Sequence, residues 1–319
     1  MATAEQLKSL IRSHFDEDKE LFTTVALQLA AHEARLGHSS LAHEIRSLVD
    51  KNKSSRVKVF HFRKDLDDLI ISSEPHERLS DLILSDEMKK RIERILREYY
   101  QREKLSKFGQ NHRRKILLAG PPGTGKTMTA TVLGGELNLP LYTILMDKLV
   151  TKYMGETSAK LRQIFEAIEE ERGVYLFDEF DAIGAERGRD NEVGEMRRVL
   201  NAFLQFIEQD SSDSLIIAAT NNLMILDQAL FRRFDDVLHY SLPSEDQIRH
   251  LITNRLGQFQ SKKLSLNSVI KEAESLSHAE ITQACDNAIK EVILEDQKYV
   301  SANLLKTMIK ERKSAYIRE

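Results

Sequence analysis

The chain of 319 residues contains no tryptophan, five prolines and one cysteine. With Cys285 alone, an internal disulfide is impossible, and a reducing compartment fits. No apolar run reaches the length that spans a membrane, and the N-terminus lacks the apolar core of a signal peptide. We therefore expect a cytoplasmic protein without a membrane partner.

Charge of one sign is also missing. The chain has 47 Lys and Arg residues against 50 Asp and Glu residues, for a formal net charge of -3. This balance gives no global electrostatic reason to bind nucleic acid. The basic cluster at residues 113–115 is short. A nucleic-acid partner is therefore not expected.

Hydrophobic periodicity divides the chain into three parts. Helical stripes fill about the first fifty residues and predict three short helices, and a polar segment follows. Five short apolar runs then alternate with helical patterns, and only helical patterns follow Pro243. Continuous apolar runs predict a parallel sheet with helices on both faces. The runs cover residues 115–119, 141–145, 174–178, 215–219 and 237–242.

A glycine-rich segment, GPPGTGKT, follows the first of these runs and opens a helical pattern. It fits G-x-x-x-x-G-K-[ST], with Gly120, Gly125, Lys126 and Thr127 in the fixed places. Glycines let backbone N–H groups surround an anion, and the helix N-terminus adds partial positive charge. Lys126 can reach the β- and γ-phosphates, and the Thr127 hydroxyl can hold Mg²⁺. A chance Gly/Pro turn is the weaker reading.

Polar residues end two further runs. Asp178 and Glu179 follow the buried run VYLF, where carboxylates are costly unless a cation is present. Asp178 would organise the metal, and Glu179 would act as general base. Asn221 could orient the attacking water or sense the γ-phosphate, or it could serve only as a turn former. The adjacent Arg232 and Arg233 could stabilise the negative charge that develops on a transferring phosphoryl group, or they could form a pair on the surface.

In this order, the segments GPPGTGKT, KYMGET, LFDEFDAIG, AATN and RRFDD resemble the AAA ATPases from about Asp81 to Ile289. The arginine segment looks more like spastin and katanin, and DEFDAIGAERG looks like the membrane AAA proteases. The body is similar to bacterial single-module AAA ATPases. The resemblance implies an α/β P-loop module with a five-stranded parallel sheet, a C-terminal helical lid and a small N-terminal helical domain. The expected boundaries are 1–52 for the N-terminal docking domain, 53–76 for a linker, 77–243 for the ATPase domain and 244–319 for the lid.

The resemblance also implies ATP and Mg²⁺ as cofactors, with Thr127 and Asp178 at the metal. The implied nucleotide contacts are Gly120, Pro121, Pro122, Gly123, Thr124, Gly125, Lys126, Thr127, Met128, Asp81, Leu82 and Ile83. Four positions depart from the family pattern at the adenine end. Leu84, Ser275 and His278 stand where glycine is usual, and Arg255 stands where a histidine is common.

The family implies a homo-oligomeric ring, usually a hexamer, in which the arginines act on a neighbour's nucleotide. Its pore loop corresponds to Lys152, Tyr153 and Met154, which would grip an extended protein substrate; Tyr153 could instead pack on its own subunit. Similar bacterial proteins are associated with subtilisin-like proteases encoded nearby.

The leading hypothesis is therefore an ATP-driven motor that remodels, unfolds or threads proteins, in some settings for a partner protease. The main alternative is an ATP-dependent regulatory switch or scaffold that controls a partner protein. A nucleic-acid motor or loader is a less favoured hypothesis. The chain itself contains no His-Glu-x-x-His or Gly-x-Ser-x-Gly segment.

Overall fold

The chain forms two compact units, Met1–Phe60 and His61–Glu319. In the first unit the described residues are helical, and Val25, Ala26 and Ala30 among them are buried. The rest of the predicted N-terminal domain lies outside the described residues. The computed structural model describes residues 8, 13, 25–26, 28–30, 32, 66, 68–149, 154–183, 190–222, 228–261 and 264–314.

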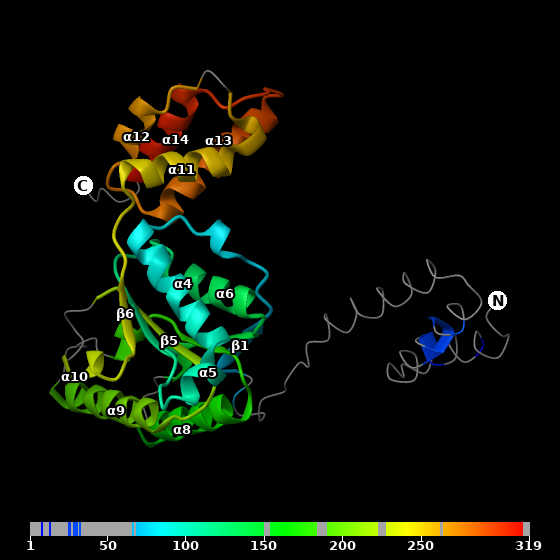
Figure 1. Ribbon diagram of the computed structural model, residues 1–319. Helices are drawn as coiled ribbons and strands as arrows, with labels where there is room; N and C mark the ends of the chain where they lie inside the picture. Colours follow the sequence, from blue (N-terminus) through cyan, green and yellow to red (C-terminus); the bar gives the residue numbers. More distant parts are fainter. Residues whose placement is uncertain are drawn as a thin grey trace. The chain divides into compact units, whose positions relative to one another are not determined.

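The second unit is built on a six-stranded sheet in the order β1-β3-β4-β5-β2-β6 (Figure 1). The strands β2 to β6 run parallel, and each overlaps one of the apolar runs in the sequence. The prediction of a parallel α/β sheet is therefore confirmed for these five strands. Their bounds are β2 Lys115–Ala119, β3 Leu141–Ile144, β4 Val174–Phe177, β5 Leu215–Thr220 and β6 Asp236–His239.

The five-stranded prediction is one strand short. Strand β1, Ile70–Ser73, pairs antiparallel with β3 and brings Ile70 opposite Ile144. It lies inside the segment 53–76 that the sequence predicted to be a linker. Strand β1 is mostly exposed: Ile70 is buried, and its other three residues are exposed.

Alternate residues of the central strands pack on opposite faces of the sheet, as a strand with two covered faces requires. Ile116 and Leu118 share one core with α4 and α6, and Leu117 belongs to the core under α8 and α9. Ser85 begins α4 by accepting a hydrogen bond from the Met88 amide. The helices of this part are α4 Asp86–Tyr100, α5 Arg102–Ser106, α6 Lys126–Leu137, α7 Met146–Leu149, α8 Met154–Glu170, α9 Asp190–Gln209 and α10 Gln228–Phe231, with short 3₁₀ turns η1 Leu79–Asp81 and η2 Phe180–Ile183.

A helical lid follows the last strand (Figure 1). It has a core of its own, which includes Ile252, Val269 and Cys285. Capping boxes at Ser244 and Ser277 define where two of its helices begin. The lid helices are α11 Glu245–Leu256, α12 Asn267–Ala273, α13 His278–Leu294 and α14 Ala302–Ser314, with the 3₁₀ turn η4 Gly257–Phe259. None of the described helices has both the length and the apolar character to cross a bilayer.

Candidate functional site

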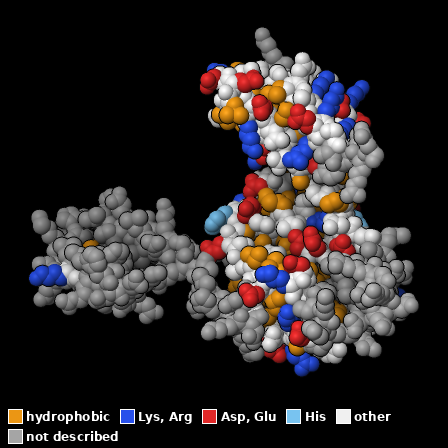
Figure 2. All heavy atoms as spheres, turned by 180° about the vertical axis from the view of Figure 1, so that it is seen from behind, with side chains coloured by type: hydrophobic (Ala, Val, Ile, Leu, Met, Phe, Trp, Pro, Cys, Tyr) orange, Lys and Arg blue, Asp and Glu red, His pale blue; other side chains and the backbone are white. Residues whose placement is uncertain are grey.

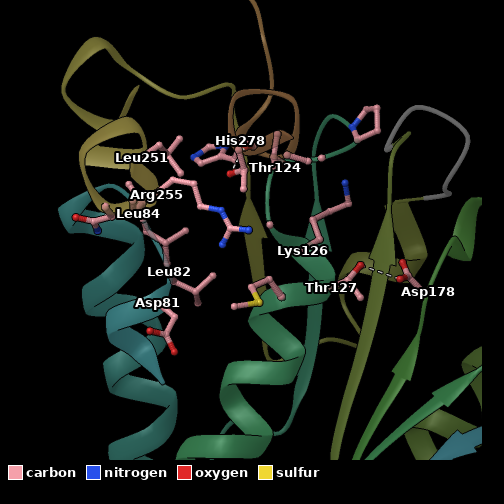
Figure 3. A pocket seen from close by; sticks show the side chains of 18 of the residues that line it. Asp81, Leu82, Leu84, Thr124, Lys126, Thr127, Asp178, Leu251, Arg255 and His278 are labelled. Atoms are coloured by element: carbon pink, nitrogen blue, oxygen red, sulfur yellow. Dashed lines mark hydrogen bonds between the residues drawn. The ribbon is translucent and has the colours of Figure 1, made fainter. Parts of the chain in front are cut away.

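A cavity of about 770 Å³ opens at the carboxyl ends of the parallel strands, between the phosphate loop and the lid (Figure 3). This edge is where ligands bind in open α/β sheets. The α/β part and the lid both contribute to its wall. The lining residues are 80–84, 122–128, 178–179 and 221 from the α/β part and 251, 254–255, 278–279 and 282 from the lid.

The backbone of the phosphate loop requires glycine at two close approaches. Gly120 has φ 151°, and a Cβ there would lie 2.3 Å from the Tyr240 carbonyl oxygen. Gly123 has φ 70°, and a Cβ there would lie 2.6 Å from Ser277 Oγ. The Ala279 amide also donates to the Gly123 carbonyl oxygen, at 3.0 Å. The start of lid helix α13 therefore rests directly on the phosphate loop.

Lys126 is buried and already surrounded by oxygen atoms. Its Nζ lies 2.8 Å from each of three acceptors, the carbonyl oxygens of Gly120 and Pro121 and the side-chain oxygen of Asn221. Burial lowers the pKa of Lys126, and the carboxylates of Asp178 and Asp181 oppose part of that shift. A phosphate oxygen entering the cavity would meet an ammonium group held in place. Of the predicted loop contacts, Gly120 and Pro121 do not line the cavity and act through these carbonyls.

Thr127 and Asp178 are brought together as the sequence predicted. The Thr127 hydroxyl donates to Asp178 Oδ2 at 2.8 Å (Figure 3). Two hard oxygen donors beside a phosphate site suit Mg²⁺, which keeps several waters and takes few protein ligands. The described residues contain no group of three or more His, Cys, Asp or Glu that could hold a metal alone. This pair therefore fits a metal ion that arrives with phosphate oxygens.

Glu179 lines the cavity two residues beyond the end of β4. Its φ of 53° lies in the left-handed region, which costs energy for a residue with a Cβ. Its backbone amide donates to Asp178 Oδ1 at 2.9 Å, so the same turn orients the Asp178 carboxylate. Such strain is typical of functional sites, and it supports the general-base hypothesis for Glu179.

Asn221, at the tip of β5, is held from both sides. Its backbone amide donates to Asp181 Oδ1 at 3.1 Å, while its side-chain oxygen accepts from Lys126 Nζ. Asp181 was not predicted as a site residue, because its role is to orient a neighbour rather than to line the cavity. The arrangement favours the water-orienting reading of Asn221 over a simple turn.

Arg232 and Arg233 lie outside this cavity. Neither is among the described residues that line it. Arg232 is exposed, and Arg233 Nε lies 3.4 Å from Glu208 Oε2 of α9. The structure therefore does not bring the two arginines to the phosphate site of their own chain.

The predicted pore loop falls mostly outside the described residues. Lys152 and Tyr153 are not described, and Met154 is described only as the first residue of α8. Their role stays a prediction from the sequence.

The far end of the cavity is walled by the predicted segment Asp81, Leu82 and Ile83, and by Leu84. Four lid residues were not predicted as contacts: Leu251, Asn254, Ala279 and Thr282. Ser80 also lines this end. The spacing of residues 251, 254 and 255 on one face of α11 is a signal that could have indicated them.

Two of the four departures from the family pattern lie on the lid side of the cavity. Arg255 points into it, while its Nε and Nη2 are held by the Asp286 carboxylate, the latter at 2.8 Å from Oδ2 (Figure 3). His278 lines the same side. Ser275 does not line the cavity, but its φ of 77° is left-handed, which explains why glycine is usual at its position.

Comparison with known proteins agrees with this geometry. Residues 116–242 match the family model described as "ATPase family associated with various cellular activities (AAA)". The chain is 32% identical over 310 residues to a protein of Sinorhizobium fredii named as an uncharacterized AAA family ATPase, covering 94% of this chain and 92% of the other.

Two archaeal relatives match about two thirds of the chain. A putative 26S proteasome regulatory subunit homolog of Methanocaldococcus jannaschii is 30% identical over 224 residues, which is 68% of this chain and 59% of that protein. A proteasome-activating nucleotidase of Methanococcus vannielii is 34% identical over 212 residues, which is 62% of this chain and 52% of that protein. The matched segments thus span little more than half the length of these archaeal relatives.

Proposed function

Because this chain belongs to the AAA family of ATPases and hydrolyses ATP, we propose that it works in a homo-oligomeric ring that remodels protein substrates. A hexamer is the expected size of that ring. A cytoplasmic location, which the single cysteine favours, is part of the proposal.

Each catalytic group of the cavity has a role in this proposal. Lys126 binds the β- and γ-phosphates, and Thr127 and Asp178 hold Mg²⁺, which supplies charge neutralisation when bound. Glu179 takes the proton of the attacking water, and Asn221 orients that water. Asp81, Leu82 and Ile83 contact the base.

The position of the two arginines carries the ring proposal. An arginine that stabilises the transferring phosphoryl group must reach the γ-phosphate. Arg232 is exposed and Arg233 pairs with Glu208, and neither lines the cavity of its own chain. A second copy that presents its arginines to this cavity would complete the site.

Mixing two inactive variants tests this arrangement. Arg233→Ala should bind ATP but lose turnover by a factor on the order of 10³ or more, as for other arginine fingers. Lys126→Ala should fail to bind the nucleotide tightly. Mixed rings can pair an intact phosphate loop with an intact arginine, so mixing should recover part of the activity. No recovery, in samples shown to exchange subunits, would refute action in trans.

A protein substrate is supported by the loop sequence and by the relatives. Tyr153, between Lys152 and Met154, combines an aromatic ring with a flexible thioether, which suits a grip on peptide of any sequence. Two relatives carry names that refer to the proteasome. We propose that this loop faces a central pore, and that a partner such as a subtilisin-like protease receives the threaded chain.

Tyr153→Ala should therefore abolish unfolding of a tagged client while basal ATP hydrolysis stays near wild type. Tyr153→Phe should keep most of the unfolding, since the ring makes the contact. Both activities are measured on the same samples. Unchanged unfolding by Tyr153→Ala would favour the alternative, an ATP-dependent regulatory switch that controls a partner protein.

A nucleic-acid motor has less support. Figure 2 shows Lys and Arg side chains intermixed with Asp and Glu side chains over one face of the described surface. Nucleic-acid binding usually relies on a stripe of positive charge.

A further inference from the structure

His278 is the first residue of lid helix α13, and its side chain lines the nucleotide cavity. Figure 3 shows its imidazole on the lid side of the cavity, between Leu251 and Thr124. The Thr127–Asp178 pair lies at a different part of the cavity wall. The ring is thus placed to meet a part of the nucleotide other than the metal-bound phosphate.

Both ring nitrogens of His278 are buried, and within the part of the chain that the structure describes neither has a hydrogen-bond partner at good geometry, although the Ile83 backbone interacts with the ring. A buried polar atom without a partner destabilises the folded state. Native structures rarely retain such atoms unless a water, ion or ligand satisfies them. The position of His278 at a nucleotide cavity makes the nucleotide the natural partner.

The surroundings favour the neutral imidazole. Burial lowers the pKa of His278, and an interaction with the Ile83 backbone opposes part of this shift. A backbone group that raises the pKa of a histidine is a carbonyl oxygen facing the ring N–H. The neutral ring has one nitrogen that carries a proton and one that accepts a hydrogen bond. The nitrogen that faces a carbonyl oxygen carries the proton, which leaves the other as the acceptor. The nitrogen that does not face Ile83 is therefore an acceptor.

We propose that this acceptor nitrogen of His278 reads the nucleobase, by accepting a hydrogen bond from the 6-amino group of adenine. Guanine and hypoxanthine carry an oxygen at that position, which would face the nitrogen lone pair to lone pair. A site that hydrogen-bonds a substrate group discriminates strongly against an analogue without it. His278 is thus a specificity-determining residue, distinct from the phosphate and metal contacts that every nucleoside triphosphate would share.

Diphosphates allow a test without turnover. The full-length wild type and His278→Phe are titrated calorimetrically with ADP, with IDP, and with the diphosphate of unsubstituted purine riboside. We expect the wild type to prefer ADP over the other two by about 5- to 10-fold or more, the range of one hydrogen bond. His278→Phe keeps a planar ring, and it should bring the three affinities to within about twofold by weakening ADP alone.

Two controls separate this effect from damage to the lid. His250 is exposed on α11 and does not line the cavity, so His250→Phe should keep the wild-type preference. His278→Gln retains an acceptor oxygen and should restore part of the preference. An unchanged ADP-to-IDP ratio in His278→Phe would overturn the proposal, as would tighter ADP binding, which would mean that the imidazole occupies the base position. Failure of the wild type to bind any of the three would count against nucleotide binding itself.

Discussion

Lys126 Nζ lies 2.8 Å from the side-chain oxygen of Asn221, so the tip of β5 holds the lysine of the phosphate loop directly. The carbonyl oxygens of Gly120 and Pro121 hold the same ammonium group at equal distances. When a phosphate binds, the lysine can exchange the Asn221 oxygen for a phosphate oxygen. The side-chain amide of Asn221 can then form a hydrogen bond with a water molecule.

Asn221→Ala should separate these two roles. Because two carbonyls still position Lys126, ATP affinity should change by no more than about fivefold, the range of one hydrogen bond. Turnover should fall by about 10²-fold or more, the scale of losing one preorganised donor or acceptor. Single-turnover kinetics and equilibrium binding measure the two effects. The neighbouring Asn222 does not line the cavity, so Asn222→Ala should affect neither. A loss confined to binding would contradict the water-orienting role.

Glu179→Gln should bind ATP and hydrolyse it about 10²- to 10⁴-fold more slowly, because the amide cannot accept the proton of water. The left-handed turn at Glu179 is kept, since the backbone does not change. Phosphate release and ATP binding are measured together. Glu169 is exposed on α8 away from the cavity, and Glu169→Gln is the matched control. Equal hydrolysis by Glu179→Gln and wild type would remove Glu179 as the base.

The contact between the phosphate loop and the lid can be tested with two glycines of nearly equal φ. Gly123 and Gly109 have φ of 70° and 69°, but a Cβ at Gly109 would meet no atom within 4 Å. Gly109→Ala should cost only the left-handed conformation, about 1–2 kcal/mol in the free energy of unfolding. Gly123→Ala must also move Ser277, so it should cost more and weaken nucleotide binding. Denaturant titrations and ADP binding check both, and equal unfolding costs would show that the lid contact is yielding.

Cys285 offers a probe of local unfolding of the lid. It is fully buried in the lid core, and burial together with the nearby Asp286 carboxylate raises its pKa to about 12, although Arg255 opposes this. At pH 8 the folded thiol should therefore be protonated and inert, and a thiol reagent should react only when the lid core unfolds locally. Nucleotide at about 100 times its Kd should slow labelling by up to about 100-fold, because it binds only the folded lid. Cys285→Ala gives the background. Rapid labelling in native buffer would contradict the prediction.

The sequence predicts the parts of this molecule whose signal is local. The run Ile116, Leu117 and Leu118 places apolar side chains on both faces of the sheet. The run alone therefore identifies a parallel strand that is covered on both sides. The phosphate loop is equally local, since its glycines and lysine are contiguous.

The features that the sequence did not predict depend on distant partners. Strand β1 exists because β3 lies beside it, and its own burial is slight. Leu251 and Thr282 contact the cavity only because two lid helices fold over the phosphate loop. On an isolated helix, a polar residue such as Thr282 resembles one that faces water. The unpaired nitrogens of His278 likewise become visible only when the buried surroundings are known.

Strand β1 also bears on how the protein behaves when it is concentrated or shortened. It hydrogen-bonds along the outer side of β3, and Leu69 accepts from the Leu145 amide just beyond it. The edge of the sheet next to β3 is thus β1, a strand of four residues, three of which are exposed. Short edge strands are poor templates for sheet growth between molecules. A fragment that begins at residue 77 would lose this cover and leave the buried, apolar β3 as a bare rim, and it should precipitate where the longer chain stays in solution.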